Sequence, residues 1–312
     1  MIKIISSNTT DPSTNIATEE FLLKNSKESF LFIYINTPSV IIGKHQNAFA
    51  EVSAKYIIDN NIPLIRRISG GGTVVHDNGN LNFCFISNHE SIETLSYKKC
   101  IEPIKDFLTH QYGISPILSE RNDIQVNNRK VTGSAFHIYK KRTIAHGTLL
   151  VNSDIKEISK ILKSATAMFD SNGVKSKRSR IMNLGEISNI PSNIEIFKDN
   201  MISFFTKQGY SYEDILNIVD YNIVKKLCQD KYTKWDWNIA YGPKFTFHIN
   251  KPQEDASYRF HVEKGYISSA YKNDYIIINT EDKVHFKKNV LVSFLQNKGH
   301  KEIAIEIDNY LL

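Results

Sequence analysis

The sequence predicts an α+β protein in two parts, a large mixed-sheet domain followed by a small α+β domain. Three observations carry this prediction. A length of 312 residues is long for one hydrophobic core and fits one large domain with a smaller one. Candidate strands and helices occur together throughout the chain. The pattern then changes at Lys244, where three antiparallel strands and two helices follow. We expect domains at residues 1–243 and 244–312, because a unit of about 70 residues lies within usual domain sizes.

The composition is that of an ordinary globular protein, with 41% hydrophobic and 23% charged residues. Lys and Arg number 39 against 33 Asp and Glu, a net charge of +6. This mild excess favours anionic ligands or an acidic protein partner over a dedicated nucleic-acid binder. Residues 1–10 contain no apolar signal segment, and no apolar run approaches the roughly 20 residues of a membrane helix. We therefore expect a cytoplasmic protein without a membrane segment.

The three cysteines are Cys84, Cys100 and Cys228. Their number is odd and none forms a CxxC pair, so neither a disulfide framework nor a zinc site is expected.

The first elements follow from local patterns. We expect strands at residues 3–6, 30–35, 39–42 and 80–87, and helices at 16–23, 52–60 and 92–112. Residues 11–15 offer caps for the first helix, whose early acids Glu19 and Glu20 suit a helix start. The second and third strands are rich in β-branched and aromatic residues. The last helix has apolar residues near a 3.6-residue spacing.

The stretch from Arg66 to Asp77 places three glycines, residues 70–72, between an arginine pair and a β-branched run. Glycine tolerates positive φ and lets a ligand approach the backbone, and successive amides in such a turn can converge on an anion. Two guanidinium groups beside them suit phosphate or carboxylate. The alternative is a hairpin turn with solvated arginines, but three glycines exceed what a two-residue hairpin needs. We interpret the stretch as an anion-binding loop held by a sheet.

A β-meander is expected after the longest helix. Residues 121–126 lead through a turn to a strand at 129–136, and a basic turn at 140–142 reverses the chain into 144–151. Lys130 opens the middle strand, and small residues at 133 and 135 leave space beside it. An exposed strand-end lysine is the commoner situation, and the residues alone leave both interpretations open.

The rest of the large domain is predicted to be mainly helical. A helix at 154–163 is capped by Ser153 or Asp154, and helices follow at 194–207 and 214–228. The basic loop at 175–180 is either solvated or a mobile flap that orders over a phosphate. In the second domain we expect strands at 245–249, 258–263 and 266–271, and helices at 286–297 and 303–311.

Several common sites have no motif in this chain. The sequence lacks GxxxxGK[ST], a strand-borne GxGxxG, HExxH and GxSxG. P-loop, Rossmann, zinc-hydrolase and nucleophile-elbow chemistries are therefore not expected. A glycine-rich anion loop, arginines, a strand lysine and a basic flap suit activation of a carboxylate as a phosphoric anhydride. That reaction brings two anions into contact, and converging cations and amides offset their repulsion.

These motifs together resemble the lipoate–protein ligase family, whose cofactor-transferase fold is shared with biotin ligases. The family's glycine loop is RRxSGGGxVxHD, its lysine strand is RKxxGSA and its polar turn is GRxQN; this chain carries them at residues 66–77, 129–135 and 43–47. Family segments also match at 121–123, 146–150, 175–184 and 260–265, so the resemblance spans about residues 15 to 270. The departures are Thr73 where alanine is common and Lys44 for arginine, which loses bidentate geometry.

The resemblance implies a two-step, ATP-dependent reaction. Lipoate and Mg–ATP would give lipoyl-AMP and pyrophosphate, and the lipoyl group would pass to a lysine of a carrier such as H-protein or the E2 subunit of a 2-oxoacid dehydrogenase. ATP and Mg²⁺ are thus co-substrates, lipoate is the substrate, and no tightly bound cofactor is implied. A monomer without nucleic-acid or membrane partners is expected.

The resemblance also implies roles for individual residues. Lys130 would be catalytic and would contact both nucleotide and lipoate. The implied nucleotide contacts are Arg67, Gly72, Thr73, Val74 and Val75; the lipoate contacts are Gly70, Gly71, His76 and Gly147; the flap residues over the adenylate are Lys175, Arg178 and Arg180; and Asp123 is a candidate magnesium ligand.

Three alternatives remain. One is an ATP-independent octanoyl- or lipoyl-transferase of the same fold, which would use a cysteine nucleophile. We expect no thiol chemistry, because none of the three cysteines is predicted beside the lysine meander. Another is a relative that uses preformed lipoyl-AMP. The third is a non-catalytic carrier- or nucleic-acid-binding protein, for which binding to nucleic acid would depend steeply on salt. The sequence does not rank lipoate, octanoate and biotin.

Overall fold

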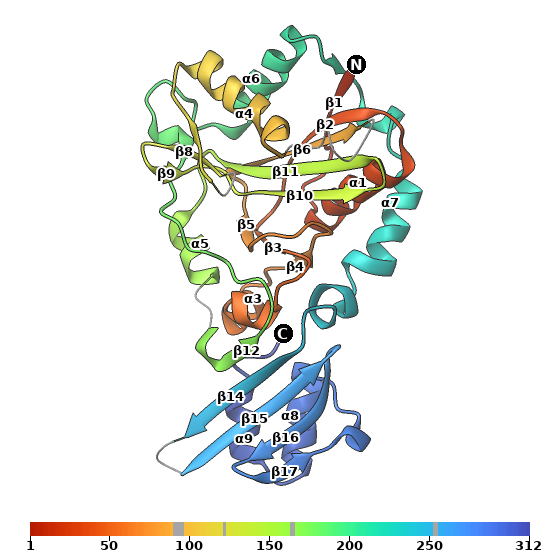
Figure 1. Cartoon of the computed structure of the whole chain (residues 1–312), viewed down its shortest axis with the longest axis vertical. Coiled ribbons are helices and arrows are strands. Elements are labelled where there is room, and N and C mark those ends of the chain that lie inside the picture. Colours follow the sequence, from red (N-terminus) through yellow and green to blue (C-terminus); the bar gives the residue numbers. More distant parts are fainter. Residues whose placement is uncertain (90–96, 121–122, 163–165, 252–254) are drawn as a thin grey trace.

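The computed structural model describes residues 1–89, 97–120, 123–162, 166–251 and 255–312. Arg121 and Asn122 of the expected meander, the start of the expected 92–112 helix and the last residue of the expected 154–163 helix lie outside these ranges. Figure 1 shows a large upper part and a small C-terminal part along the long axis of the molecule.

A six-stranded mixed sheet forms the centre of the large part. Its strand order is β10-β11-β6-β2-β1-β13. The bounds are β1 Ile2–Ser6, β2 Ser29–Ile35, β6 Asn80–Asn88, β10 Ser134–Tyr139, β11 Arg142–Leu150 and β13 Ser211–Tyr212. β1 runs parallel to both of its neighbours, whereas the other pairs are antiparallel. The predicted mixed-sheet α+β class is confirmed.

Helices cover both faces of this sheet because its strands alternate apolar residues between the two faces. On one face Leu31 and Ile33 pack with α4 (Tyr97–Tyr112) and α6 (Ile194–Lys207). On the other face Phe30 and Phe32 pack with α1 (Pro12–Asn25) and α7 (Tyr221–Leu227). Figure 1 shows these two helix pairs around the sheet. None of the helices in the described residues is both long and apolar enough to cross a bilayer.

Two small sheets extend from the central one. The first has the order β4-β3-β5, with β3 Ser39–Ile42, β4 Leu64–Arg66 and β5 Val74–His76; the second is β7-β8-β9, with β7 Ile117–Leu118, β8 Ile124–Val126 and β9 Arg129–Lys130. The glycine loop therefore joins β4 to β5. The expected single strand at 129–136 is wrong, since the chain leaves β9 after Lys130. Residues 131–133 then bond to β8 and β11, through Val131 N to Ile124 O and Thr148 N to Gly133 O.

Capping side chains decide several helix boundaries. Asp11, one of the residues expected to offer a cap, accepts a hydrogen bond from Thr14 N at 2.7 Å and starts α1. The helix begins at Pro12, earlier than the expected residue 16, so Glu19 and Glu20 lie beyond its first turn. The expected helix at 52–60 is observed as α3 Ala54–Asp59, which Ser53 caps. A further short helix, α2 Ala48–Glu51, is capped by Asn47 and was not predicted. Of the two candidate caps for α5 (Ile155–Ile161), Asp154 supplies the hydrogen bond.

The helix expected at 214–228 is interrupted. A 3₁₀ turn covers Ile215–Asn217, α7 follows, and a π-helical turn covers Cys228–Tyr232. Asp214 and Asp220 each cap a new segment, so the backbone restarts rather than continuing.

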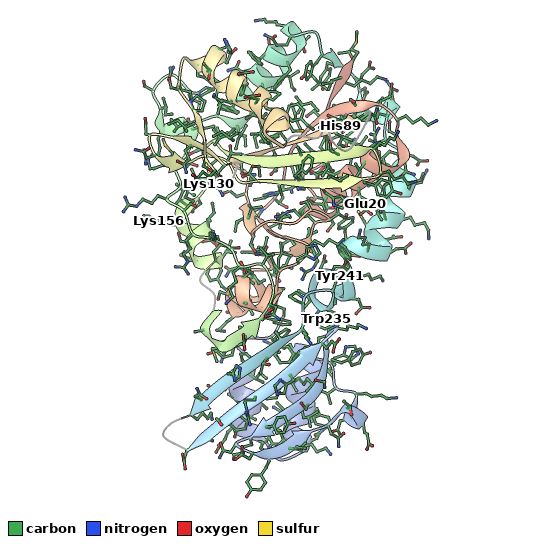
Figure 2. The ribbon with its side chains drawn as sticks, in the orientation of Figure 1. Glu20, His89, Lys130, Lys156, Trp235 and Tyr241 are labelled. Atoms are coloured by element: carbon green, nitrogen blue, oxygen red, sulfur yellow. The ribbon has the colours of Figure 1, made fainter. Side chains whose placement is uncertain are left out.

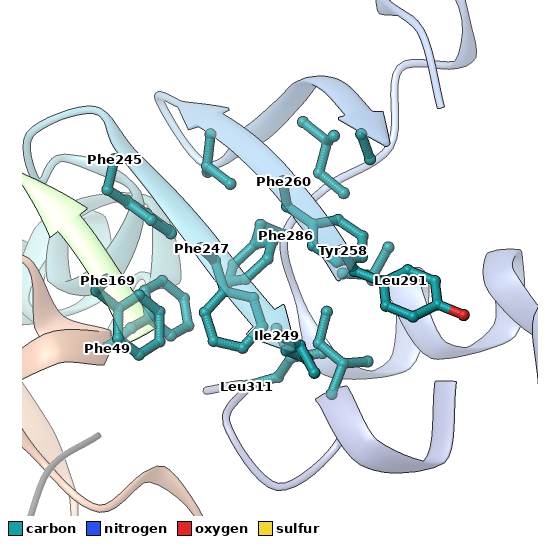
Figure 3. Packing of buried hydrophobic residues seen from close by; sticks show 14 of the residues in the cluster. Phe49, Phe169, Phe245, Phe247, Ile249, Tyr258, Phe260, Phe286, Leu291 and Leu311 are labelled. Atoms are coloured by element: carbon teal, nitrogen blue, oxygen red, sulfur yellow. The ribbon is translucent and has the colours of Figure 1, made fainter. Parts of the chain in front are cut away.

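The C-terminal part is a five-stranded sheet covered by two helices. The strand order is β12-β14-β15-β16-β17, with β12 Phe169–Ser171, β14 Phe245–Lys251, β15 Ala256–Glu263, β16 Tyr266–Lys272 and β17 Tyr275–Ile278; the helices are α8 Lys288–Asn297 and α9 Lys301–Ile307. Figure 3 shows Phe49 and Phe169 packed beside the core of this sheet. Because β12 and Phe49 precede residue 244, the predicted boundary at 243 and 244 stays a prediction, while the expected three strands are in fact five.

Candidate active site

The glycine loop folds around the side chain of Arg67. The Arg67 guanidinium donates from Nη2 to the carbonyls of Gly70 (2.6 Å) and Gly72 (2.8 Å), and from Nη1 to Ile41 O (3.0 Å). Gly71 has φ +88°, which side-chain-bearing residues rarely adopt. Because both carbonyls bind the same guanidinium, the loop is closed around Arg67. Arg67 and Gly71 line the cavity beside it.

Arg66 has a different place from the one expected. Its side chain is fully buried and donates to the carbonyls of Gly43, Lys44, Gln46 and Trp237 at 2.8–3.1 Å. Burial lowers the pKa of Arg66 to about 10. The expectation that both guanidinium groups are available to an anion is therefore wrong, because Arg66 ties the 43–46 turn to the segment around residue 237.

The polar turn at residues 43–47 is pressed against the glycine loop. A Cβ atom at Gly43 would lie 2.2 Å from Gly71 O, so only glycine permits this approach. Gln46 Oε1 accepts from Gly43 N at 2.9 Å and from the Thr73 hydroxyl at 3.0 Å. Lys44 lines neither of the cavities described below. The turn therefore supports the loop through its backbone and Gln46.

Lys130 lies at the end of β9, where the small sheet meets the central one (Figure 2). Its ammonium is 3.0 Å from Asp123 Oδ1 and its side chain is only 23% exposed. Its backbone N–H donates to Arg180 O (2.8 Å) and its carbonyl accepts from Met182 N (3.1 Å). A Cβ at Gly133 would lie 3.7 Å from Lys130 Cε, an ordinary packing distance, and 3.1 Å from Val74 Cγ1, so glycine at this position relieves Val74 more than Lys130. The alternative of a solvated strand-end lysine does not hold.

Two adjoining cavities, of about 340 and 580 Å³, meet at Lys130. The residues common to both are Thr73, Val74, Lys130, Gly133, Thr148, Lys175, Ser176, Lys177 and Ser179. The smaller cavity continues to Ile16, Tyr34, Ile41, His76, Asn82 and His146; the larger one continues to Ala50, Glu51, Leu150, Ile158, Leu162 and Ile181. Lys130 can thus touch ligand groups that enter from either side.

Most of the site residues implied by the resemblance line these cavities. The lining residues are Arg67, Gly71, Gly72, Thr73, Val74, Val75, His76, Asp123, Lys130, Gly147, Lys175 and Arg178. Gly70 and Arg180 line neither cavity, because their carbonyls face Arg67 and the amide of Lys130. Their assigned contacts stay predictions.

A buried hydrogen-bond chain that the sequence analysis missed runs behind the loop. Arg67 Nε donates to Ser69 Oγ (2.9 Å), which lies 2.7 Å from His146 Nε2, and His146 Nδ1 lies 2.6 Å from Glu19. Tyr34 donates to the same carboxylate at 3.0 Å. Because arginine only donates, Ser69 Oγ is the acceptor in its bond with Arg67. The available signal was His146 between the apolar pairs 144–145 and 149–150 of β11.

Cys84 lies closer to the lysine meander than predicted. It pairs in register with His146 across β6 and β11, so the expectation that no cysteine lies by the lysine meander is wrong. The thiol is nevertheless fully buried and lines neither cavity. Burial, followed by the Glu19 charge, raises its pKa well above the ordinary value, which disfavours the nucleophilic thiolate.

His76 is a neutral donor in the wall of the smaller cavity. Asn36 Nδ2 lies 2.9 Å from His76 Nδ1, and an amide NH₂ can only donate, so the ring proton is on Nε2. Burial, then the charges of Arg67 and His146, lower the pKa of His76 to about 3.

This pKa predicts a pH-dependent stability. In the unfolded chain His76 has its ordinary pKa of 6.5 and is protonated below that pH. In the folded protein His76 stays neutral down to about pH 3. The stability contribution of His76 is complete above pH 6.5 and declines by about 1.4 kcal/mol per pH unit below it. Between pH 6.5 and 5, the free energy of unfolding measured in urea should fall by about 2 kcal/mol more in the wild type than in His76→Gln. Equal losses in the two proteins would contradict this.

The comparisons with known proteins agree with this geometry. The family described as "Lipoyl protein ligase A/B catalytic domain" matches residues 11–206. Lipoate–protein ligase 1 of Staphylococcus aureus is 39% identical over 99% of this chain and 95% of its own length. The lipoate–protein ligase LplJ of Bacillus subtilis is 36% identical over 84% of this chain and 81% of its own. A crystal structure of P. falciparum LipL1 in complex with lipoate superposes with a TM-score of 0.64 at 26% identity, covering 99% of both chains.

Proposed function

The chain belongs to the lipoyl protein ligase A/B family and is a lipoate–protein ligase, and we propose that it joins lipoate to AMP at Lys130 before transferring the lipoyl group to a carrier. The observation that carries the assignment of the site is the position of Lys130 at the junction of two cavities beside the glycine loop.

In the first step a lipoate carboxylate oxygen attacks the α-phosphorus of ATP, a P–O bond forms and pyrophosphate leaves. We assign the smaller cavity to the lipoyl chain, since Ile16, Tyr34 and Ile41 provide apolar wall, and the larger one to the nucleotide. The Lys130 ammonium then faces both the carboxylate and the phosphate as charge builds between them. A fixed cation at that point stabilises the transition state more than the separated reactants.

Magnesium would arrive with ATP as part of the co-substrate. Mg²⁺ is commonly held by one or two carboxylates together with substrate phosphates, so the single carboxylate of Asp123 fits such an ion. Because this carboxylate is paired with Lys130 at 3.0 Å, the same residue can hold the lysine and the metal near the phosphates.

In the second step the amine of a carrier lysine attacks the lipoyl carbonyl, an amide bond forms and AMP leaves. The carriers we propose are lipoyl domains of H-protein or E2 subunits. We further propose that the chain acts as a monomer in the cytoplasm and uses no nucleic acid.

A cysteine-dependent acyl transfer between carriers is the second candidate, because Cys84 lies beside β11. Its buried, high-pKa thiol lines neither cavity, so we favour the ligase.

One experiment separates these functions. An H-protein or lipoyl domain is incubated with the enzyme and lipoate, octanoate or biotin, with and without ATP, and its mass is measured. We expect the carrier to gain the acyl mass only with ATP, with one pyrophosphate released, and Cys84→Ala to retain this activity. Transfer from a loaded carrier without ATP that Cys84→Ala abolishes would establish the transferase. If the carrier is modified when lipoyl-AMP is added but not when lipoate and ATP are added, the protein does not catalyse the first step.

A further inference from the structure

The hydroxyl of Ser176 joins the basic flap, residues 175–180, to two other parts of the site. Ser176 Oγ accepts from Thr73 N (2.9 Å) in the glycine loop and from Gln46 Nε2 (3.0 Å) in the polar turn. It donates to Oε2 of Glu51, at the end of α2. A hydroxyl offers one donor and two acceptor positions, and all three are used here. Ser176 therefore uses its full hydrogen-bonding capacity in this contact.

Glu51 completes the contact from the opposite side. Its carboxylate also faces the Ser176 amide, with N–O distances of 3.3 Å to both oxygens, and the Thr73 hydroxyl at 3.4 Å. Glu51 is only 7% exposed and no Lys or Arg is among these partners. A buried carboxylate is costly unless hydrogen bonds satisfy it, so its contacts with the flap and loop hold it in place.

Gly72 is the third requirement for this contact. A Cβ at residue 72 would lie 3.2 Å from Ser176 Oγ and 3.5 Å from Ser176 Cα. A side chain at residue 72 would therefore crowd the Ser176 hydroxyl, so glycine favours this contact.

The flap is fixed at its two ends as well. Val174 N donates to His45 O at 3.0 Å, and Arg180 O accepts from the amide of Lys130 at 2.8 Å. Between these points Ser176 is the residue that joins the flap to the glycine loop, while Lys175 and Ser176 line both cavities. The cavities keep their volumes of about 340 and 580 Å³ beneath the closed flap. Closure therefore leaves room for a ligand.

We propose that Ser176 and Glu51 form a clasp that holds the flap closed over lipoyl-AMP until the carrier arrives. The inference rests on the proposed function. A mixed anhydride hydrolyses when water attacks its carbonyl, a C–O bond forms and lipoate and AMP are released. A flap held over the anhydride limits that loss. Ser176 and Glu51 are thus positioning residues for the second step.

Two variants, Ser176→Ala and Glu51→Gln, test the clasp. Each removes hydrogen bonds of roughly 1 kcal/mol, so the flap should open about five- to tenfold more often. We expect the AMP released per carrier lipoylated to rise by a similar factor. Because both residues line the cavities, pyrophosphate release is measured in the same reactions, and the clasp predicts that transfer to the carrier falls more than pyrophosphate release does. Ser188→Ala, an exposed serine beyond the flap that lines neither cavity, is the matched control and should keep the wild-type ratio.

A second measurement needs no substrate. Limited trypsin digestion should cleave the flap at Lys175, Lys177 or Arg178 faster in both variants than in the wild type or the control. Unchanged AMP-to-carrier ratios and cleavage rates would overturn the clasp. So would an equal loss of pyrophosphate release and transfer, which would place these residues in activation. If the wild type makes no lipoyl-AMP, the proposed function fails, while the digestion still tests the clasp.

Discussion

Replacing Lys130 with alanine is expected to slow lipoyl-AMP formation by at least about a hundredfold, the scale of losing one transition-state donor. The Lys130 ammonium lies at the junction of both cavities, 3.0 Å from Asp123. Without it, the approaching carboxylate and phosphate lose the cation that faces them both. The loss should appear in single-turnover pyrophosphate release, with a smaller effect on the binding of either substrate.

Two further variants make this result specific. Lys156→Ala removes an exposed lysine on α5 (Figure 2) and should leave the rate unchanged. Lys130→Arg keeps the charge but replaces a compact ammonium with a planar fork, so partial activity at most is expected. Near-normal lipoyl-AMP formation by Lys130→Ala would refute the role assigned to this residue.

Replacing Arg66 with methionine is expected to lower the free energy of unfolding by at least about 3 kcal/mol. Four carbonyls, at residues 43, 44, 46 and 237, lose the donor that Arg66 supplies. The bonds to residues 43 and 46 are buried and the other two are partly buried. Each buried acceptor left without a partner costs about 1–3 kcal/mol, and methionine refills most of the volume. Urea unfolding of the two proteins measures the difference.

Arg178→Met is the control for this stability effect. Arg178 is an exposed flap residue, so its replacement should change the free energy of unfolding by no more than about 0.5 kcal/mol. If Arg66→Met unfolds within about 1 kcal/mol of wild type, Arg66 is not the structural tie that its contacts indicate.

Local signals predicted elements well where one cap or one period dominates. Helix α6 begins and ends at the predicted residues 194 and 207. The prediction was wrong where a second capping residue interrupts the pattern, as Asp220 does in the helix expected at 214–228. A capping side chain competes with helix continuation, and the outcome depends on packing outside the segment.

The C-terminal sheet shows a different limit. Its three inner strands follow from alternation in the sequence, but β12 reaches it from residues 169–171 and pairs with β14. A three-residue strand has no periodicity to detect, so its partner is set by tertiary contacts alone.

The sequence by itself determined the chemistry of this protein: a tri-glycine loop, a strand lysine and a basic flap, in an order that identifies the family. These signals are local, because each motif lies within about a dozen residues. Only the tertiary structure decided which arginine supports the loop from within and which is buried as a tie. It also decided that Ser176 meets Glu51, 125 residues earlier in the chain. Hydrogen-bond partners so far apart are brought together by packing, which leaves no periodic trace in either segment.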